Sequence, residues 1–502
     1  MPTRETFYMK TPWFIMLLAI APAASAEEAA SKPDPIAGYS NGSFFLRDPN
    51  DWFVLFPKGR LQIDGYFFPQ RGDAPAGVEN NAQADPRPKS TVFMRRARAE
   101  LQGTLLGHFD FNFAGEFAST PATGSFGTVA DAYVIVDYLS WLKLQVGQFD
   151  LPFTFENRTS DKYFDFMERS VVVRAFGVPQ NKDSGAMLKG WLPRNVGHYE
   201  FGLFNGELLQ DFKNQDNNLA IIGRAFVAPL APLAFAQRNK WAEKIWVGGS
   251  FWWQKNTNLG QGPSSTVGST TGGAQNDLPG MTTQGGVSFF STSYGNGKDA
   301  MNNAIRTHLV PDGEMVKGAV ELNVPIKWAG VRAELVYQKT GLASYNDTAP
   351  GGILKRPSRL RTGELEGLGY YIEAYGWIVG DTSFMNSSLG TEDAPRYKKF
   401  TPAPQPRWGL MVAAKYEHVA FNVRNLSGST DPATATTVAD PAEGRYALDV
   451  FELGLNAWGT KHVRLTANYV MNYMSGDAPN MKKNYYFEKF EHELLFRVGI
   501  AL

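Results

Sequence analysis

The chain has no cysteine, no excess of charge of either sign, and little histidine. Its 502 residues contain 49 Lys and Arg against 49 Asp and Glu, together with six His. The absence of cysteine excludes a disulfide scaffold and a thiolate metal site. The balanced charge removes the electrostatic basis for binding nucleic acid, which needs an excess of Lys and Arg to neutralise phosphates. We therefore expect no nucleic-acid partner.

Long apolar runs are also missing, except near the N-terminus. Two basic residues precede an apolar run at residues 13–21, which is followed by an Ala-Ser-Ala sequence that ends at Ala26. This run is shorter than the ~20 apolar residues of a spanning helix, and small-x-small is the pattern of a signal-peptidase site. The sequence predicts a signal peptide over residues 1–26 that is cleaved on export. Beyond it, the lack of apolar runs excludes a bundle of membrane helices.

What recurs in the remaining chain is alternation with period two. Residues 109–117 read Phe-Asp-Phe-Asn-Phe-Ala-Gly-Glu-Phe, which places the aromatic rings on one face of a strand and the polar groups on the other. The alternating runs last about 9–12 residues, the length that a tilted strand needs to cross a bilayer, whereas strands of soluble sandwiches average about 5–6. The pattern predicts an all-β protein, a transmembrane β-barrel.

A count of candidate strands gives seventeen segments, of which residues 283–290 are the weakest because they are short and flanked by Gly, Ser and Thr. Single-chain barrels have an even number of strands, and short and long connections alternate here only when this segment is left out. Region 255–314 then becomes an outside loop, in which a stray strand can extend above the membrane. Residues 59–502 form the barrel, and residues 27–58 form a periplasmic N-terminal segment. We therefore predict an antiparallel barrel of sixteen strands with a water-filled lumen, at residues 60–68, 92–104, 108–118, 129–138, 141–148, 185–192, 197–205, 219–229, 244–254, 315–327, 330–339, 369–379, 407–417, 446–458, 462–471 and 490–502.

Several short motifs follow in order along the predicted barrel. They read Arg-Arg-Ala-Arg-Ala-Glu-Leu-Gln-Gly at 95–103, Asp-Ala-Tyr-Val at 131–134, Leu-Gln-Val-Gly-Gln-Phe at 144–149, Thr-Ser-Asp-Lys at 159–162, Phe-Met-Glu-Arg at 166–169, Gly-Tyr-Tyr-Ile-Glu-Ala-Tyr at 369–375, Leu-Gly-Leu-Asn-Ala-Trp at 453–458 and Val-Arg-Leu-Thr-Ala-Asn-Tyr at 463–469. In these motifs the chain resembles the phosphate-selective porin family (porins O and P). The resemblance implies a homotrimeric channel in the bacterial outer membrane, with small anions such as phosphate and outer-membrane lipid as its partners. It also implies that Lys and Arg groups in the lumen bind the anion.

Residues 149–184 are the candidate selectivity segment. By parity they form the third outside loop, which is far too long for a hairpin turn. In general porins this loop folds into the lumen and narrows it, and the resemblance implies the same here. A basic side chain in a constricted, low-dielectric passage can replace the water around an anion with charge-assisted hydrogen bonds. Local salt bridges that hold the loop in place are the alternative for each candidate. The candidates are Lys162 and Arg169, which lie within the family-like motifs, and Arg158 and Arg174.

Alternation also assigns charged residues of the strands to the lumen. Ten basic residues fall on this face, and among them are Arg60, Arg96, Arg98 and Lys143. Arg96 and Arg98 stand two positions apart, which is compatible with a local basic stripe, and scattered ionic pairs wetted by lumen water are the alternative. Twelve acidic residues share the face. This balance favours a weakly selective pore, and phosphate preference therefore depends on the resemblance.

Motifs for enzyme chemistry are missing. The six His show no H-E-x-x-H spacing, and the sequence contains no G-x-S-x-G. We expect no catalytic residue, no cofactor and no metal site. The main prediction is an outer-membrane porin, a passive channel for small hydrophilic solutes and ions. The alternatives are a non-selective barrel that serves as an adhesin or a barrel enzyme, and a secreted soluble β-protein.

Overall fold

The structure of the chain is a computed structural model dominated by antiparallel strands. The predicted signal peptide and the first part of the predicted N-terminal segment lie outside the described residues. In the part of the chain that the structure describes, no helix has the length and apolar character that a membrane span requires. The structure describes residues 36–40, 43–69, 89–118, 128–177, 182–206, 214, 217–256, 280–298, 304–348, 361–380, 408–426, 442–460, 462–478 and 490–502.

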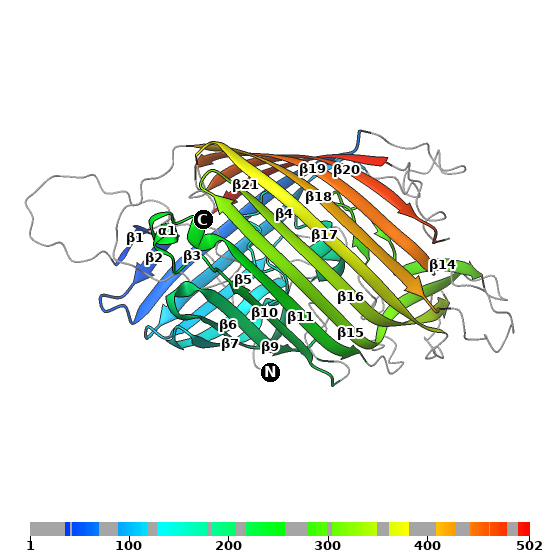
Figure 1. The fold of residues 1–502 in the computed structure, drawn as a ribbon, viewed down its shortest axis with the longest axis horizontal. Helices are drawn as coiled ribbons and strands as arrows, with labels where there is room; N and C mark the ends of the chain where they lie inside the picture. Colours follow the sequence, from blue (N-terminus) through cyan, green and yellow to red (C-terminus); the bar gives the residue numbers. More distant parts are fainter. Residues whose placement is uncertain are drawn as a thin grey trace, which may run out of the picture. The chain divides into compact units, whose positions relative to one another are not determined.

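Sixteen strands form one closed barrel (Figure 1), in which each strand pairs with the next along the chain. The last strand pairs with the first in the register Arg497↔Asp64, which closes the ring. Every predicted segment overlaps one of these strands, so the prediction of a sixteen-stranded antiparallel barrel is confirmed. The strands are β3 (Phe53–Phe67), β4 (Thr91–Leu105), β5 (Phe109–Glu116), β6 (Thr128–Leu139), β7 (Leu142–Asp150), β8 (Lys182–Trp191), β9 (Gly197–Phe204), β10 (Ala220–Val227), β11 (Trp246–Asn256), β15 (Ala304–Ile326), β16 (Ala329–Thr348), β17 (Arg361–Val379), β18 (Gly409–Arg424), β19 (Gly444–Thr460), β20 (Val463–Gly476) and β21 (Phe490–Ala501).

Side chains alternate across the wall as the period-two pattern predicts. On β20 the side chain of Leu465 is 52% exposed on the outer face, whereas that of Thr466 is 5% exposed and points inward. The described tryptophans that are more than half exposed stand at the edge with the short turns, namely Trp52, Trp141, Trp328 and Trp408. Apolar outer faces that end in a belt of aromatic rings are typical of barrels in a bilayer, because the rings favour the interface with water.

The strands on one side of the barrel are much longer than on the other. β5 and β9 have eight residues each, whereas β15 has 23 and β16 has 20. β15 and β16 stay paired up to Ile305↔Thr348, and β14 (Ser293–Lys298) pairs with the first residues of β15. Part of the predicted outside loop 255–314 is therefore strand. The apolar alternation predicts only the part of a strand that faces lipid, whereas backbone pairing continues beyond it.

Short elements surround the edge of the barrel that carries the short turns. β1 (Ala37–Ser40) and β2 (Ser43–Arg47) form a hairpin that pairs with the start of β3. The hydroxyl of Tyr39 lies 2.6 Å from Nε2 of His462 in the turn between β19 and β20. The turn between β8 and β9 contains the 3₁₀ helix η2 (Pro193–Asn195), and the connection between β10 and β11 contains α1 (Ala234–Arg238) and η4 (Ala242–Lys244). Because β3 begins at Phe53, the wall starts before the predicted boundary at residue 59.

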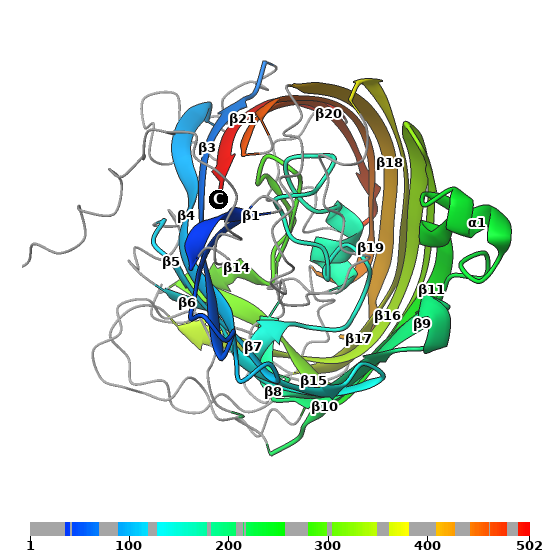
Figure 2. The same cartoon turned by 90° about the vertical axis from the view of Figure 1, so that its left-hand side faces the viewer.

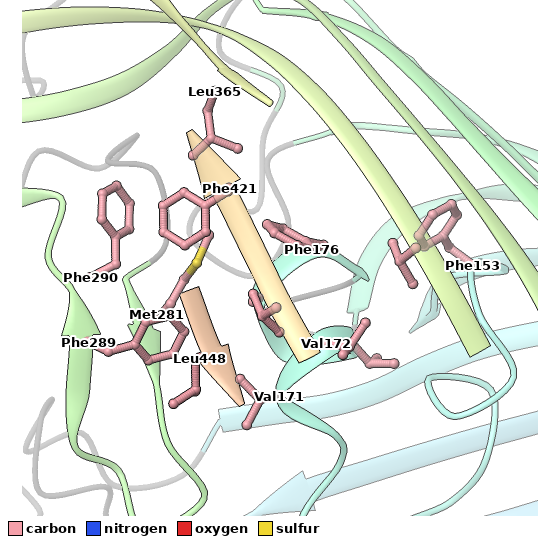
Figure 3. Packing of buried hydrophobic residues seen from close by; sticks show 14 of the residues in the cluster. Phe153, Val171, Val172, Phe176, Met281, Phe289, Phe290, Leu365, Phe421 and Leu448 are labelled. Carbon is pink, nitrogen blue, oxygen red and sulfur yellow. The ribbon is translucent and has the colours of Figure 1, made fainter. Parts of the chain in front are cut away.

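Two further segments lie against inward-facing side chains of the wall (Figure 2). The first is residues 151–177, which end in the π-helix η1 (Val173–Gly177); the second is residues 280–290, with β12 (Met281–Thr282) and β13 (Ser288–Phe290). Phe290 packs on the inward ring of Phe421 on β18, and Phe176 packs on the same ring (Figure 3). The prediction that all of 255–314 lies outside is therefore wrong for residues 281–290, because their apolar side chains are buried against the inner wall.

Candidate functional site

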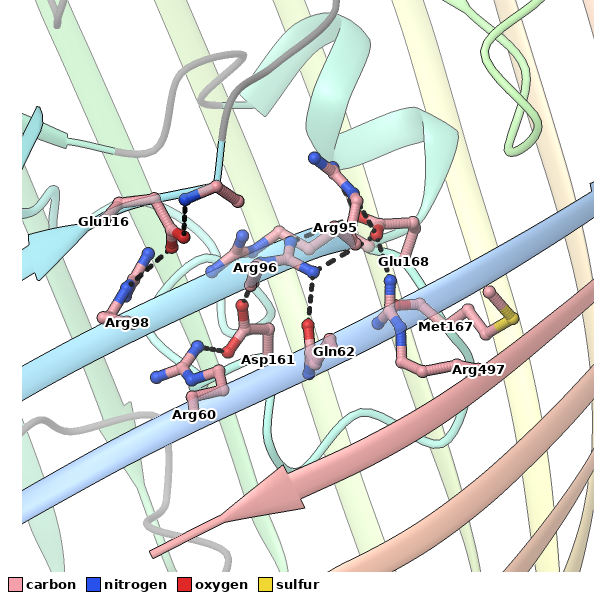
Figure 4. Close-up of polar contacts among 12 residues, drawn as sticks. Arg60, Gln62, Arg95, Arg96, Arg98, Glu116, Asp161, Met167, Glu168 and Arg497 are labelled. Carbon is pink, nitrogen blue, oxygen red and sulfur yellow. Dashed lines mark hydrogen bonds and ion pairs between the residues drawn. The ribbon is translucent and has the colours of Figure 1, made fainter. Parts of the chain in front are cut away.

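The loop of residues 151–177 is tied to the wall by Glu168, whose carboxylate meets three arginines (Figure 4). Arg95 donates from Nε and Nη2 at 3.0 and 3.2 Å, Arg96 donates at 3.3 and 3.4 Å, and Nη2 of Arg497 donates at 2.6 Å. Burial alone would raise the pKa of Glu168, but the three guanidinium groups lower this pKa well below its usual range. Glu168 therefore stays ionised and fixes the loop to β4 and β21.

A β-bulge explains why two consecutive arginines of β4 reach the same carboxylate. The register between β3 and β4 shifts between Gln62↔Arg96 and Ile63↔Met94, which leaves Arg95 without a paired residue. In a regular strand consecutive side chains point to opposite faces, and a bulge locally breaks this alternation. Arg95 therefore joins Arg96 inside the barrel. Of these two consecutive arginines, strict alternation predicts only Arg96 in the lumen.

The other predicted basic residues of the wall also have acidic partners. Asp161 of the loop binds Arg60 and accepts from Nε of Arg96 at 2.6 Å. Arg98 lies 3.2 Å from Glu116 and 3.8 Å from Asp131, and Lys143 lies 3.0 Å from Asp137, as a set of pairs between or along neighbouring strands. Arg96 and Arg98 thus lie on the inward face together with Arg60 and Arg95, and each of these arginines pairs with a carboxylate.

The loop also reaches the opposite part of the wall, where acidic residues predominate. The carboxylate of Glu334 on β16 accepts hydrogen bonds from the backbone N–H groups of Phe155 and Glu156 at 3.1 and 2.8 Å, and from the hydroxyl of Tyr371 at 2.8 Å. Asp165 binds Arg332, which also lies 2.8 Å from Glu373. The carboxylates of this region are thus held by backbone and side-chain donors of the loop and the wall.

Arg158 and Arg169 are enclosed within the loop. Arg158 is fully buried and makes a two-point contact with Glu200 at 3.1 and 2.8 Å, while its Nη1 donates to the carbonyl of Asp150 at 2.6 Å. Arg169 donates to the backbone carbonyls of Glu156 and Thr159 at 3.3 Å each, and its guanidinium lies 4.9 Å from the centre of the Phe164 ring. Both arginines therefore hold the shape of the loop.

Lys162 and Arg174 are the two basic residues of the loop that remain partly exposed to the lumen. Nζ of Lys162 lies 3.6 Å from Glu100. Nη2 of Arg174 donates to the carbonyls of Thr282 and Thr283 at 3.2 and 3.0 Å, so its partners are uncharged. Burial lowers the pKa of Lys162 to about 7, although Glu100 acts in the opposite direction. These two side chains present the loop's positive charge to lumen water.

Inward-facing acidic and basic side chains differ in how deeply they are buried. In the loop and in the described strands from β3 to β11 and from β16 to β21, two inward acids are partly exposed, Glu100 and Glu116. The other inward acids are buried. The ten basic and twelve acidic residues that alternation assigns to the lumen therefore do not describe the charge that is exposed to water. The partly exposed inward bases are Lys58, Arg95, Arg98, Lys143, Lys162, Arg174 and Arg464.

Residues that could hold a metal ion do not cluster in the part of the chain that the structure describes. No group of three or more His, Asp or Glu there has a suitable arrangement. The chemistry that this lumen offers is electrostatic, since guanidinium and ammonium groups at partial exposure attract anions and donate hydrogen bonds to them.

Comparisons with known proteins were made for the sequence and for the fold. No curated protein matches the chain. Among solved structures, a loop L8 deletion mutant of OmpT, an outer membrane protein of Vibrio cholerae, has 10% identity and a TM-score of 0.48, with 90% of this chain and 100% of that chain covered. The outer membrane channel DcaP of Acinetobacter baumannii has 8% identity and a TM-score of 0.45, with coverage of 90% and 97%. An anion-selective porin from Comamonas acidovorans has 10% identity and a TM-score of 0.44, with coverage of 90% and 100%.

The sequence model of one family matches the part of the chain that builds the site. This family is the phosphate-selective porin O and P, and the match runs over residues 75–284. It includes the bulged strand β4, the loop 151–177 and the tip of the inward segment 280–290. Residues 75–284 of this sixteen-stranded barrel therefore resemble the phosphate-selective porin O and P family, and the match supports a porin channel.

Proposed function

We propose that this porin is a passive diffusion channel that favours small anions. The observation that carries the proposal is the separation of lumen charges by burial, which leaves mostly basic side chains in contact with water. A lumen wall that exposes one sign of charge raises the local concentration of the opposite ion. Phosphate, the anion in the family's description, is the first candidate among these anions.

The proposed constriction is formed by the loop of residues 151–177. Its contacts support this assignment, because Glu168 binds the wall at β4 and β21 while Asp165 binds Arg332 on β16. A segment that contacts distant parts of one wall leaves a smaller passage beside it. We assign Lys162 and Arg174 to the rim of this passage, together with Arg95 and Arg98 on β4.

We assign different roles to the remaining candidates. Arg158 and Arg169 position the loop, since their nitrogens are engaged by Glu200 and by backbone carbonyls. Arg60 and Arg96 hold Asp161 against the wall. Lys143 stands beside Asp137 and contributes to the vestibule. None of these roles requires a covalent step, and we infer that transport is driven by the gradient of the solute.

The reversal potential of the channel in a planar bilayer under a KCl gradient tests the proposal. The wild type should prefer chloride, and Lys162→Glu and Arg174→Glu should each shift the potential towards that of a cation channel. Lys339→Glu is a matched control, because this lysine stands on the outer face and pairs with Glu364 at 3.0 Å. A wild-type channel that prefers potassium would contradict the proposal. Added phosphate should reduce the chloride current in the wild type more than in Lys162→Glu.

We also propose the maturation and assembly that the sequence and the family resemblance suggest. Residues 1–26 are removed by signal peptidase, so N-terminal sequencing of the barrel from outer membranes should begin at Glu27. Three copies form a trimer, so chemical cross-linking in detergent should give a ladder that ends at three chains. A ladder that ends at one or two chains would contradict this assembly.

A further inference from the structure

The segment between β12 and β13 forms a small hairpin inside the barrel, here called the lumen hairpin (residues 281–290). Met281 pairs with Phe290, and the N–H of Thr283 donates to the carbonyl of Val287 at 2.8 Å. The turn contains Gly286, whose φ of +86° is a conformation that glycine adopts without strain. The lumen hairpin is thus a defined element with its own backbone hydrogen bonds.

Apolar side chains hold the lumen hairpin on the inner wall. Phe290 is fully buried, and its ring centre lies 4.9 Å from that of Phe421 on β18 and 5.0 Å from that of Tyr446 on β19. Met281 and Phe289 are buried in the same cluster, beside Phe421 and Leu448 (Figure 3). Burial of three large apolar side chains gives this segment a fixed place in the barrel, since each contributes about 1.5–3 kcal/mol.

The polar tip of the lumen hairpin contacts two carboxylates of the wall. Glu493 on β21 accepts from the hydroxyl of Thr283 at 2.5 Å and from the N–H of Gly285 at 2.7 Å. Glu417 on β18 accepts from the side-chain amide of Gln284 at 3.2 Å. Both glutamates are fully buried, and Glu417 also pairs with Nζ of Lys415 at 3.0 Å. In the described part of the chain, no Lys or Arg forms an ion pair with Glu493, so the hairpin supplies donors that water would otherwise supply.

Glycine at position 285 permits this close approach. A Cβ atom at this position would lie 2.8 Å from Cδ of Glu493 and 3.0 Å from the ring of Phe68, so the side chain of Glu493 would have to shift. The tip of the hairpin is therefore shaped to fit over this carboxylate. The same tip holds Arg174, whose guanidinium donates to the side chain of Gln284 at 3.3 Å.

We propose that the lumen hairpin is a cover that removes the charge of Glu493 from the ion path and thereby helps to set the anion preference of the channel. The inference rests on the proposed function, and it adds Thr283, Gln284 and Gly285 as determinants of selectivity. Without the cover, the carboxylate of Glu493 joins the lumen surface close to Arg174. Because salt screens charges beyond about 8 Å, such nearby groups affect the ion path more than distant ones.

Substitutions that remove the two side-chain donors test the cover. The double variant Thr283→Val with Gln284→Leu keeps the size of both side chains, and we expect its chloride-to-potassium permeability ratio to fall about threefold or more. Adding Glu493→Gln to this variant should restore most of the ratio, because the uncovered carboxylate is then neutral. The control is Thr466→Val, an inward threonine whose hydroxyl donates to the amide oxygen of Asn456 at 3.0 Å. An unchanged ratio in the double variant would overturn the proposal.

A labelling experiment tests whether the lumen hairpin covers position 493, independently of ion selectivity. The chain has no cysteine, so Glu493→Cys provides a single thiol for a cationic methanethiosulfonate reagent. We expect slow labelling in the otherwise intact channel and labelling about tenfold faster when residues 281–290 are replaced by a short Gly-Ser linker. Equal labelling rates with and without the lumen hairpin would overturn the proposal that it covers position 493. A wild-type channel without anion preference would contradict the proposed function instead, and the labelling rates would still decide the cover.

Discussion

Arg95 and Glu168 form a two-point contact, with Nε to Oε1 at 3.0 Å and Nη2 to Oε2 at 3.2 Å, that joins the bulge of β4 to the loop of residues 151–177. The two residues are 73 positions apart, and neither would meet the other without the bulge. Two parallel hydrogen bonds between a guanidinium and a carboxylate fix orientation as well as distance. This contact therefore sets where the loop lies relative to the basic wall.

The first prediction concerns this anchor. Glu168→Gln removes the charge that Arg95, Arg96 and Arg497 share, so three buried or half-buried cations lose their common partner. Breaking a buried charge pair from one side costs about 3–5 kcal/mol. We expect the unboiled protein to lose its compact electrophoretic migration at a lower temperature than the wild type. Glu116→Gln, which affects a carboxylate paired with Arg98 alone at 3.2 Å and not with three arginines, should lower this temperature less.

The second prediction separates positioning from pore-lining residues within the loop. Arg158→Met leaves Glu200 buried without its two-point partner, so the barrel should be destabilised by about 3–5 kcal/mol. Lys162→Met removes a partly exposed charge and should change thermal stability little while it lowers anion preference. The two variants are compared by heat modifiability and by reversal potential. A larger stability loss in Lys162→Met than in Arg158→Met would reverse the assigned roles.

The third prediction is a pH dependence of selectivity. Because burial lowers the pKa of Lys162 to about 7, its ammonium group is charged below this pH and neutral above it. The groups that face it are Glu100, which favours the charged form, and Arg60, Lys58 and Arg98, which oppose it. Chloride preference should therefore be stronger at pH 6 than at pH 8.

The variant Lys162→Arg is the matched test of this dependence, because a guanidinium keeps its charge throughout the range. Its channel should prefer chloride equally at both pH values, and Lys162→Met should show the weak preference at both. Glu156 also titrates in the tested pH range, since burial raises its pKa to about 7. It is enclosed by the loop, so Glu156→Gln should leave the pH profile in place. A profile that persists in Lys162→Arg would assign the titration to another group.

The fourth prediction concerns the lipid face. Leu335 on β16 is 41% exposed on the outer wall, and Arg at this position should destabilise the inserted barrel by about 2–4 kcal/mol if it lies at the midplane of the bilayer. Leu335→Phe keeps the face apolar and serves as the control. Folding into lipid vesicles, followed by urea titration, gives both free energies. Equal stability of the Arg and Phe variants would show that this face does not contact hydrocarbon.

Much of the barrel could be predicted because lipid on one side and water on the other impose a strict period of two. Residues 463–469 show this well, since the predicted outer residue Leu465 and inner residue Thr466 lie as expected. The extensions of β15 and β16 at residues 304–314 and 340–348 were missed, because apolar and polar residues do not alternate there in the sequence. The lumen hairpin was missed for a related reason. Its three buried apolar residues are too few and too irregularly spaced to indicate which wall they contact.

The sequence by itself determined the fold class, the strand count and the face of most charged residues, since these depend on local periodicity and on the lengths of connections. The tertiary structure alone decided which charges meet water. Lys162 and Arg169 lie in similar motifs of one loop, yet Lys162 is partly exposed and Arg169 is enclosed by carbonyls and an aromatic ring. Arg95 reached the lumen through a bulge, and Glu493 was covered by a hairpin about 210 residues away in the sequence. Charge and face are local properties of a strand, whereas exposure depends on segments that are brought together only when the barrel closes.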